Sequence, residues 1–336
     1  MNAFVFSGNA GYEHLRLKEL LVARGLKPLE VRHCVKGVLT RVKQKVLIPK
    51  VCFLHVETLG DEAGFDHNSY YVKTKVHNLF DETSIQTWTK KDLLHLSIGK
   101  FIAKTHPLES FVYEGGLYVT RPSNLLCFSG KGVFFIDSQD SFEEAKKFYD
   151  SEKLRLSSSK RSLRYYEVIV SEYITNPVLW RGKKSHIRLY GIVSSGKPFK
   201  ISRFGSILTA ALPFRREDFS NKLIHDTHGK TTERETLFPE EFERQDLLEV
   251  FNQQLDELEI ELDKLCKPKP YPQAERAYIL LGIDLMVRTT GEIVLIEIND
   301  RPGLQPCNGK ITEEYQRLCF VLDEWIWENI KHLFSS

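Results

Sequence analysis

Two adjoining apolar segments near the end of the chain constrain the fold more than any other feature. Residues 278–287 (YILLGIDLMV) and 292–300 (EIVLIEIND) are separated by a turn sequence rich in Thr and Gly, which predicts a β-hairpin. Asp284 lies on one strand, and Glu297 and Asn299 lie on the other. Because residues two apart on a strand face the same side, these side chains can converge on one point. The hairpin therefore carries a polar cluster where core residues would normally lie.

The three polar side chains have the chemistry of a magnesium site. Carboxylate and amide oxygens are hard ligands, and Mg²⁺ usually binds one or two carboxylates together with substrate phosphates. We therefore predict that Asp284, Glu297 and Asn299 hold Mg²⁺. The alternative interpretation is a solvated strand face, since ordinary alternation also gives this pattern.

Two other segments carry positive charge suited to phosphate. Residues 128–132 (FSGKG) place Lys131 among glycines that let the backbone approach phosphate oxygens, although an ordinary β-turn can look the same. Lys184, His186 and Arg188 alternate along a predicted strand and so share one face. Opposite an acidic metal site, such a face would neutralise a triphosphate during transfer. The alternative interpretation of these three residues is a solvated basic hairpin.

The remaining pattern predicts a mixed α/β chain. Short apolar segments and an amphipathic stretch before Gly25 indicate a small α/β domain in the first hundred residues. From residue 112 onward, β-rich segments separated by Gly, Ser and Pro favour an antiparallel sheet that covers a nucleotide. The predicted elements are strands over 3–7, 28–32, 51–57 and 200–214 and helices over 13–24, 92–104, 139–149, 239–266 and 312–333.

Composition bounds the class of protein. Hydrophobic residues make up 42% and charged residues 27% of the 336 residues, which excludes a disordered chain. The six cysteines have no metal-ligand spacing and are expected to be reduced thiols. There is no secretory signal pattern and no long apolar stretch, so we expect a soluble cytoplasmic protein without membrane contact.

The net charge of +2 conceals an asymmetry. Residues 1–234 carry a net charge of +13, and residues 235–336 carry −11. A basic part of this size suits an enzyme that holds a polyphosphate ligand and an acidic protein at once. We expect no nucleic-acid partner, because no interleaving of aromatic and basic residues accompanies the charge.

Taken in order, these segments resemble the tubulin–tyrosine ligase family of the ATP-grasp superfamily, from about residue 76 to the C-terminus. The motifs that carry the resemblance are Lys90-Lys91-Asp92, Val119-Thr120-Arg121-Pro122, Ser129-Gly130-Lys131-Gly132-Val133, Glu167 to Ile174 followed by Asn176-Pro177-Val178-Leu179, Lys184-Ser185-His186-Ile187-Arg188, His225-Asp226-Thr227-His228, and Gly282-Ile283-Asp284 with Leu295-Ile296-Glu297-Ile298-Asn299 and Pro302-Gly303.

The resemblance implies an ATP-grasp fold of the α/β (α+β) class. We expect an N-terminal α/β subdomain over residues 1–105, a central subdomain over 106–180 and a C-terminal subdomain over 181–336. The antiparallel sheets of the last two would enclose ATP. The implied reaction is carboxylate–amine ligation. A substrate carboxylate attacks the γ-phosphate of ATP, and an amine then displaces phosphate from the acyl-phosphate to leave an amide or isopeptide bond.

The resemblance also implies roles for single residues. Phosphates would bind Arg121 and Lys131, adenine would meet backbone groups of Glu172 and Ile174, and the ribose would lie near Lys184. Catalysis would depend on Arg188, which stabilises the transferring phosphoryl group, on Glu297, and on Lys91, which positions substrate together with Thr227. Asp284, Glu297 and Asn299 would carry Mg²⁺.

The chain departs from the family pattern at several positions. Arg121, His186 and His228 stand where the family has Lys, Asp and Asn. Leu208 stands where the family carries an Arg that contacts the amino acid or phosphate. Arg203 is five residues earlier and therefore on the opposite face of an unbroken strand. These departures bear on the choice of amino acid more than on ATP and Mg²⁺.

The function we expect is ATP- and Mg²⁺-dependent ligation of a free amino acid, glutamate in the first place, to an acidic protein or peptide, with a tubulin tail among the candidate acceptors. One alternative is a small-molecule kinase on the same fold, of the inositol polyphosphate type. Its phosphorylated substrate would bind Lys197, Lys200, Arg203, Arg215 and Arg216. Another alternative is a non-catalytic nucleotide-binding scaffold, suggested by Leu208, His186 and His228.

Overall fold

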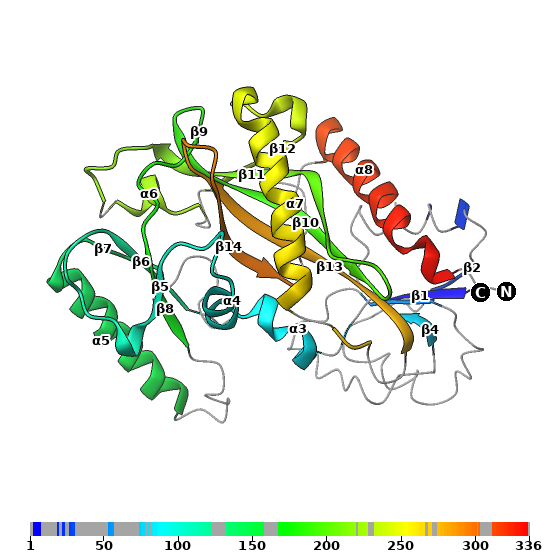
Figure 1. The fold of residues 1–336 in the computed structure, drawn as a ribbon, viewed down its shortest axis with the longest axis horizontal. Helices are drawn as coiled ribbons and strands as arrows, with labels where there is room; N and C mark the ends of the chain where they lie inside the picture. Colours follow the sequence, from blue (N-terminus) through cyan, green and yellow to red (C-terminus); the bar gives the residue numbers. More distant parts are fainter. Residues whose placement is uncertain are drawn as a thin grey trace.

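The described part of the chain forms two β-sheets with helices packed on them (Figure 1). The computed structural model describes residues 3–7, 19, 22–23, 27–30, 53–56, 74–77, 80, 82–122, 132–157, 167–219, 221–227, 232–265, 268–270, 274–300, 302 and 311–334. No described helix is both long and apolar enough to cross a membrane. Cys319, the one cysteine among these residues, is a buried thiol.

The larger sheet joins strands from the two ends of the chain. Its order is β12 (Glu233–Leu237), β11 (Lys200–Pro213), β10 (Lys183–Ser194), β13 (Ala274–Val287), β4 (Thr74–His77), β3 (Phe53–Val56), β1 (Ala3–Ser7) and β2 (Lys27–Glu30), with β14 (Ile293–Asn299) beside β13 and β9 (Leu179–Trp180) beside β10. The pairs among β1 to β4, and that of β4 with β13, are parallel, whereas β10 to β14 pair antiparallel. The long strand β13 therefore links the N-terminal strands to the C-terminal antiparallel part.

The smaller sheet is antiparallel throughout. Its order is β5 (Thr105–Pro107), β8 (Val168–Glu172), β6 (Tyr118–Pro122) and β7 (Phe134–Ile136). Helix α5 (Gln139–Ser157) packs on it through Phe142, Ala145 and Tyr149. In Figure 1 this sheet and α5 lie to one side of the larger sheet. This antiparallel sheet and the antiparallel part of the larger one agree with the mixed α/β class expected from the sequence.

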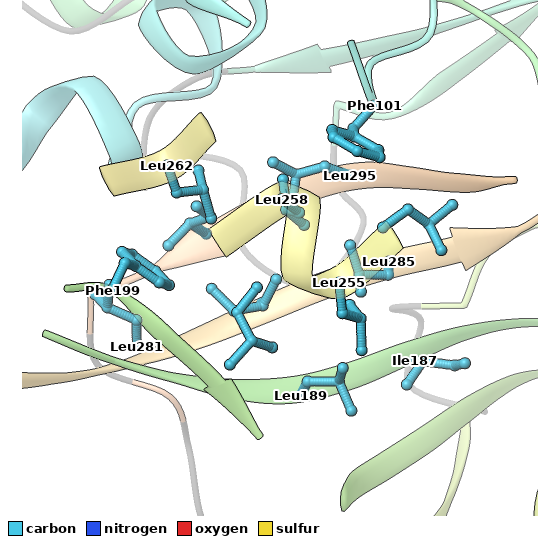
Figure 2. Close-up of a cluster of buried hydrophobic side chains, with 14 of the residues drawn as sticks. Phe101, Ile187, Leu189, Phe199, Leu255, Leu258, Leu262, Leu281, Leu285 and Leu295 are labelled. Atoms are coloured by element: carbon cyan, nitrogen blue, oxygen red, sulfur yellow. The ribbon is translucent and has the colours of Figure 1, made fainter. Parts of the chain in front are cut away.

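The main core lies between helix α7 (Leu248–Leu265) and one face of β10, β13 and β14. Leu255, Leu258 and Leu262 of α7 pack against Leu281 and other strand residues (Figure 2). Helix α3 (Glu82–Thr89) closes the end of this core, where the Trp88 indole N–H donates to the Leu262 carbonyl at 3.0 Å. Burial of this apolar face fixes which side of each strand is left for chemistry.

Helix α8 (Glu313–Ile330) covers part of the opposite face. Its Leu318, Leu322 and Ile326 pack with Tyr190 of β10 and Tyr278 of β13. Further along β10 on that same face lie Arg188, His186 and Lys184, because alternate residues share a face. The face therefore has an apolar half under α8 and a polar half beyond it.

Several predicted helices differ from the observed ones at their ends. The helix expected over 92–104 is α4 (Lys91–Ser97), and it ends before Gly99 and before Phe101, whose φ of 68° is not helical. The helix expected over 239–266 begins only at Leu248. Short 3₁₀ turns at Pro239–Glu241 and Gln245–Leu247 precede it, because Phe242 turns into the core.

Other predictions are confirmed. The helix expected over 139–149 extends to Ser157, the final helix spans Glu313–Ile330 with a 3₁₀ turn at Lys331–Phe334, and strand β11 matches 200–214. Strands β1, β2 and β3 agree with the three N-terminal strands expected. Most of the helix expected over 13–24 lies outside the described residues. Helix α3, the helix α6 (Lys222–His225) and the 3₁₀ turn at Leu108–Ser110 were not expected.

Gly205 marks the closest approach of β10 and β11, and it gives a stability test. A Cβ atom there would overlap the backbone carbonyl oxygen of Arg188. We expect Gly205→Ala to lower the free energy of unfolding by about 1–3 kcal/mol or more, the usual range for overpacking. Urea unfolding measures the change. Gly99→Ala is the matched control, because a Cβ atom at Gly99 has open space. Equal midpoints for the two variants would contradict the prediction.

Candidate active site

A β-bulge in the β13–β14 hairpin positions the acidic residues. Asp284 is directly opposite Glu297, whereas Leu285 is opposite Leu295, so Ile296 is an extra residue on β14. Strict alternation would place Leu295 on the same face as Glu297. The bulge instead sends Leu295 into the main core and leaves Glu297 on the polar face. The bulge thus lets Glu297 and Asn299 stay on the face of Asp284 while Leu295 packs in the core.

Each of the two carboxylates has a cation beside it. Asp284 is fully buried and accepts hydrogen bonds from Nε and Nη2 of Arg188, the latter at 2.6 Å. Burial alone would lower the pKa of Arg188, but the ion pair and hydrogen bonds with Asp284 raise it. Glu297 lies 2.7 Å from Lys91 Nζ at the start of α4, and it accepts from Asn299 Nδ2 at 2.9 Å. Both carboxylates are therefore held in fixed positions.

The smaller sheet contacts the bulge directly. The Ile296 carbonyl accepts a hydrogen bond from Arg121 Nη1 of β6 at 2.9 Å, and His95 Nε2 of α4 lies 2.8 Å from the same oxygen. Burial lowers the pKa of His95 to about 3, so the ring is neutral and its Nε2 carries the proton that it donates. Arg121 also donates to the Ser171 hydroxyl at 2.8 Å. The bulge is thus held from two separate elements.

Arg121 keeps hydrogen-bonding capacity. Burial lowers its pKa to about 10, partly offset by Glu297, so the guanidinium stays charged at neutral pH. Among the described residues, its buried Nε has no hydrogen-bond partner. Arg121 therefore lies beside the acidic pair with one buried donor that the described residues leave unsatisfied.

The residues predicted to meet adenine and ribose lie at the other end of this face. Ile174 is buried in a small apolar cluster with Ala103, Met286 and Val294, which joins the two sheets. Glu172 ends β8 with its side chain exposed, and its backbone N–H donates to the Lys104 carbonyl at 2.9 Å. The apolar cluster thus packs the end of β8 against the β13–β14 hairpin.

Lys184 is buried over an aromatic ring. Its Nζ lies 4.1 Å from the centroid of Tyr173. Burial lowers the pKa of Lys184 to about 7, with Asp226 opposing the shift and Arg121 adding to it. The charges of Lys184 and Arg121 therefore interact across the two sheets.

The described residues 221–227, which follow β11, contact the neighbourhood of Lys184. Thr227 is buried, and its hydroxyl lies 2.7 Å from His186 Nδ1. His186 Nε2 lies 3.9 Å from Asp284 Oδ2. The Tyr173 hydroxyl lies 2.7 Å from His225 Nδ1 in α6. His186, which replaces an Asp of the family pattern, therefore connects the acidic pair to the loop.

The structure brings most of the predicted site residues into one region. Arg188, Asp284, Glu297, Asn299, Lys91 and Arg121 are linked by the contacts above, with Lys184 nearby. Lys131 and His228 lie outside the described residues. The contribution of His95 was not predicted, because a lone histidine on an amphipathic helix is indistinguishable from a core residue in the sequence.

The donor set fits Mg²⁺ bound together with phosphates. Two carboxylates and one amide lie on neighbouring strands, and no described cluster of three or more His, Cys, Asp or Glu residues is arranged to bind a metal by itself. Mg²⁺ keeps water and substrate phosphates among its ligands and seldom needs a complete protein cage. Asp284, Glu297 and Asn299 would hold the ion, which would neutralise charge on the phosphates.

Arg203 does not face this site. Its guanidinium pairs with Asp256 and Glu259 of α7, on the core side of the sheet. Leu208 lies directly opposite His186. The structure therefore confirms that Arg203 is on the opposite face of β11 from Leu208, and it cannot supply the missing cation there.

Comparison with known proteins agrees with the geometry. The model of the tubulin-tyrosine ligase family matches residues 128–320, a shorter range than the resemblance suggested but more than half of the chain. The matched range includes Arg188 and the β13–β14 hairpin, whereas Lys91 and Arg121 precede it. No curated protein gives a match. Together, the family match and the two-sheet architecture show that the chain belongs to the tubulin–tyrosine ligase family, an ATP-grasp family of ATP-dependent ligases that form amide bonds.

Proposed function

We propose that this ligase joins free glutamate to a carboxylate of an acidic protein or peptide in the cytoplasm, with ATP and Mg²⁺. The observation that supports it most is the pairing of two carboxylates with two cations on one face: Asp284 with Arg188, and Glu297 with Lys91. A tubulin tail is one candidate acceptor. The positive charge of residues 1–234 suits an acidic chain.

The proposed reaction has two steps. The acceptor carboxylate attacks the γ-phosphorus of ATP, the bond to the β-phosphate oxygen breaks, and ADP leaves. The amine of glutamate then attacks the acyl carbon, phosphate leaves, and the amine gives up a proton as the amide forms. Charge on the phosphoryl oxygens is the main obstacle in the first step, so fixed cations near them lower the barrier.

Each residue has a defined part in this proposal. Arg188 stabilises the transferring phosphoryl group, and Lys91 positions the acceptor carboxylate together with Thr227. Arg121 and Lys131 bind phosphates, and Lys184 lies near the ribose. The backbone of Glu172 and Ile174 meets adenine. In this proposal, ATP lies between the central subdomain (106–180) and the C-terminal subdomain (181–336), with residues 1–105 as the N-terminal subdomain.

The kinase alternative is weaker in the structure. Two of the cations expected to bind its phosphorylated substrate, Lys200 and Arg203, pair with Glu259 of α7 on the core side of the sheet. A substrate on the polar face cannot reach them. The amide-forming reaction therefore remains the better proposal.

The first prediction concerns the reaction itself. Purified protein with ATP, Mg²⁺, a glutamate-rich peptide and radiolabelled glutamate, glycine or tyrosine in separate tubes should transfer label to the peptide with equimolar ADP. We expect glutamate to give the highest incorporation, measured by scintillation counting and intact mass. ATP-dependent phosphorylation of an inositol polyphosphate, without label on any peptide, would instead support the kinase. ATP binding without ADP release would support the scaffold.

The second prediction concerns Glu297. Glu297→Gln removes one charge from the proposed metal site and frees Lys91 from its partner, so ADP production should fall by roughly 10²-fold or more. The Mg²⁺-dependent part of the thermal shift caused by ATP should fall as well. Glu292→Gln is the matched control, since Glu292 is an exposed carboxylate on the turn of the same hairpin, 3.6 Å from Arg288. Loss of turnover in both variants to the same degree would remove Glu297 from the site.

The third prediction concerns pH. Because the pKa of Lys184 is about 7, its amine changes from mostly charged to mostly neutral between pH 6 and pH 8. Anionic ATP favours the charged form, so the Kd for Mg-ATP should rise by up to roughly tenfold over this range. Lys184→Arg keeps its charge and should show a flatter profile by calorimetry. If the two profiles have the same slope, Lys184 does not contact the nucleotide.

A further inference from the structure

Arg234 on β12 shares the polar face with the proposed active site. His186 is directly opposite Leu208 on β11, and Leu208 is directly opposite Arg234 on β12. Directly opposed residues of antiparallel strands place their side chains on the same face. His186 already contacts Thr227 and lies near Asp284 on the polar face. Arg234 therefore belongs to the same row of side chains, two strands from His186.

The neighbours of Arg234 along β12 support this orientation. Glu235 pairs with Arg181 at 3.0 Å, and the backbone N–H of Arg181 donates to Glu243. Glu243 follows Phe242, which is part of the main core under α7. Glu235 therefore reaches toward the core side of the sheet, and alternation directs Arg234 to the polar side.

The charges of Arg234 and Arg188 both influence the pKa of Tyr190. Burial raises the pKa of Tyr190, and the positive charges of Arg234 and Arg188 both oppose that rise. Arg188 faces Asp284 across β10 and β13. Two guanidinium groups thus act on the Tyr190 region from the two sides of β11, although they are far apart in the sequence.

The ligase reaction requires a cation of this kind. A free amino acid carries an α-carboxylate that takes no part in bond formation and must be held while the amine attacks. Arg188 and Lys91 have other parts in the proposed reaction, at the transferring phosphoryl group and at the acceptor carboxylate. Leu208, in the middle of the row, provides no charge. An arginine binds a carboxylate through two parallel hydrogen bonds, which fixes both position and orientation.

We propose that Arg234 binds the α-carboxylate of the incoming amino acid, so that the cation absent at Leu208 is supplied from the neighbouring strand. This inference rests on the proposed ligase function and assigns its amino-acid site to the β11–β12 edge of the sheet. In this proposal, the apolar side chain of Leu208 lies between the bound carboxylate and His186. Because every amino acid has the same α-carboxylate, Arg234 holds whichever labelled amino acid the enzyme incorporates.

The experiment removes the positive charge at position 234 and then returns one at position 208. Arg234→Leu should raise the KM for labelled glutamate by roughly 10- to 100-fold, the range for losing a charged hydrogen-bonded pair, while the KM for ATP stays within about twofold. Arg234→Lys keeps the charge but loses the two parallel hydrogen bonds of the guanidinium. Its KM for glutamate should lie between those of the wild type and Arg234→Leu. The double variant Leu208→Arg/Arg234→Leu returns a cation to the row and should recover at least about tenfold of the loss. Arg181→Gln is the control, since it removes a positive charge from the other face of the same edge.

Equilibrium dialysis of labelled glutamate, with Mg²⁺ and a non-hydrolysable ATP analogue, measures the same effect without turnover. An Arg234→Leu enzyme that melts like the wild type and keeps its glutamate affinity would overturn the assignment, and so would an equal rise in the KM for ATP. A double variant that recovers nothing would also overturn it. If the wild type neither binds glutamate nor incorporates any of the three amino acids, the ligase proposal fails, and this inference fails with it.

Discussion

The Ile296 carbonyl and the two groups that donate to it hold the candidate active site together. His95 comes from α4 and Arg121 from the smaller sheet, and both contact the extra residue of the β14 bulge. A buried carbonyl that lacks a ladder partner must find donors elsewhere, because leaving it unsatisfied is costly. This requirement ties the smaller sheet to the larger one at the position where Asp284 and Glu297 meet.

The charges of the site are arranged as two pairs, each of one carboxylate and one cation. Buried carboxylates need cations nearby, and Arg188 and Lys91 supply them. In our proposal, Asp284 and Glu297 would hold Mg²⁺, which would supply positive charge beside the phosphates, while Arg188 acts on the transferring phosphoryl group and Lys91 positions the acceptor carboxylate. Fixed charges that need little reorganisation are what phosphoryl transfer requires.

Much of the fold could be predicted from local patterns. Apolar spacing predicts the β13–β14 hairpin, strand β11 and helices α5 and α8. Their predicted ranges agree with the structure apart from their ends. The start of α7 could not be predicted, since Phe242 fits a helical pattern but turns into the core before the helix begins. Nor could the pairing of β4 with β13, because residues 74–77 and 274–277 are distant in the sequence and carry no mark of their register.

The sequence by itself determined which residue types are available and on which face each strand presents them, because alternation is a local property of the extended chain. It placed Lys184, His186 and Arg188 together, and it separated Arg203 from Leu208. Only the tertiary structure decided the register between strands. That register pairs Arg188 with Asp284, sends Leu295 into the core through a bulge, and sets Arg234 beside Leu208. The physical reason is that strand register depends on contacts between segments that are distant in the sequence. His95 and Arg121, for example, must both donate hydrogen bonds to the Ile296 carbonyl when the sheets pack.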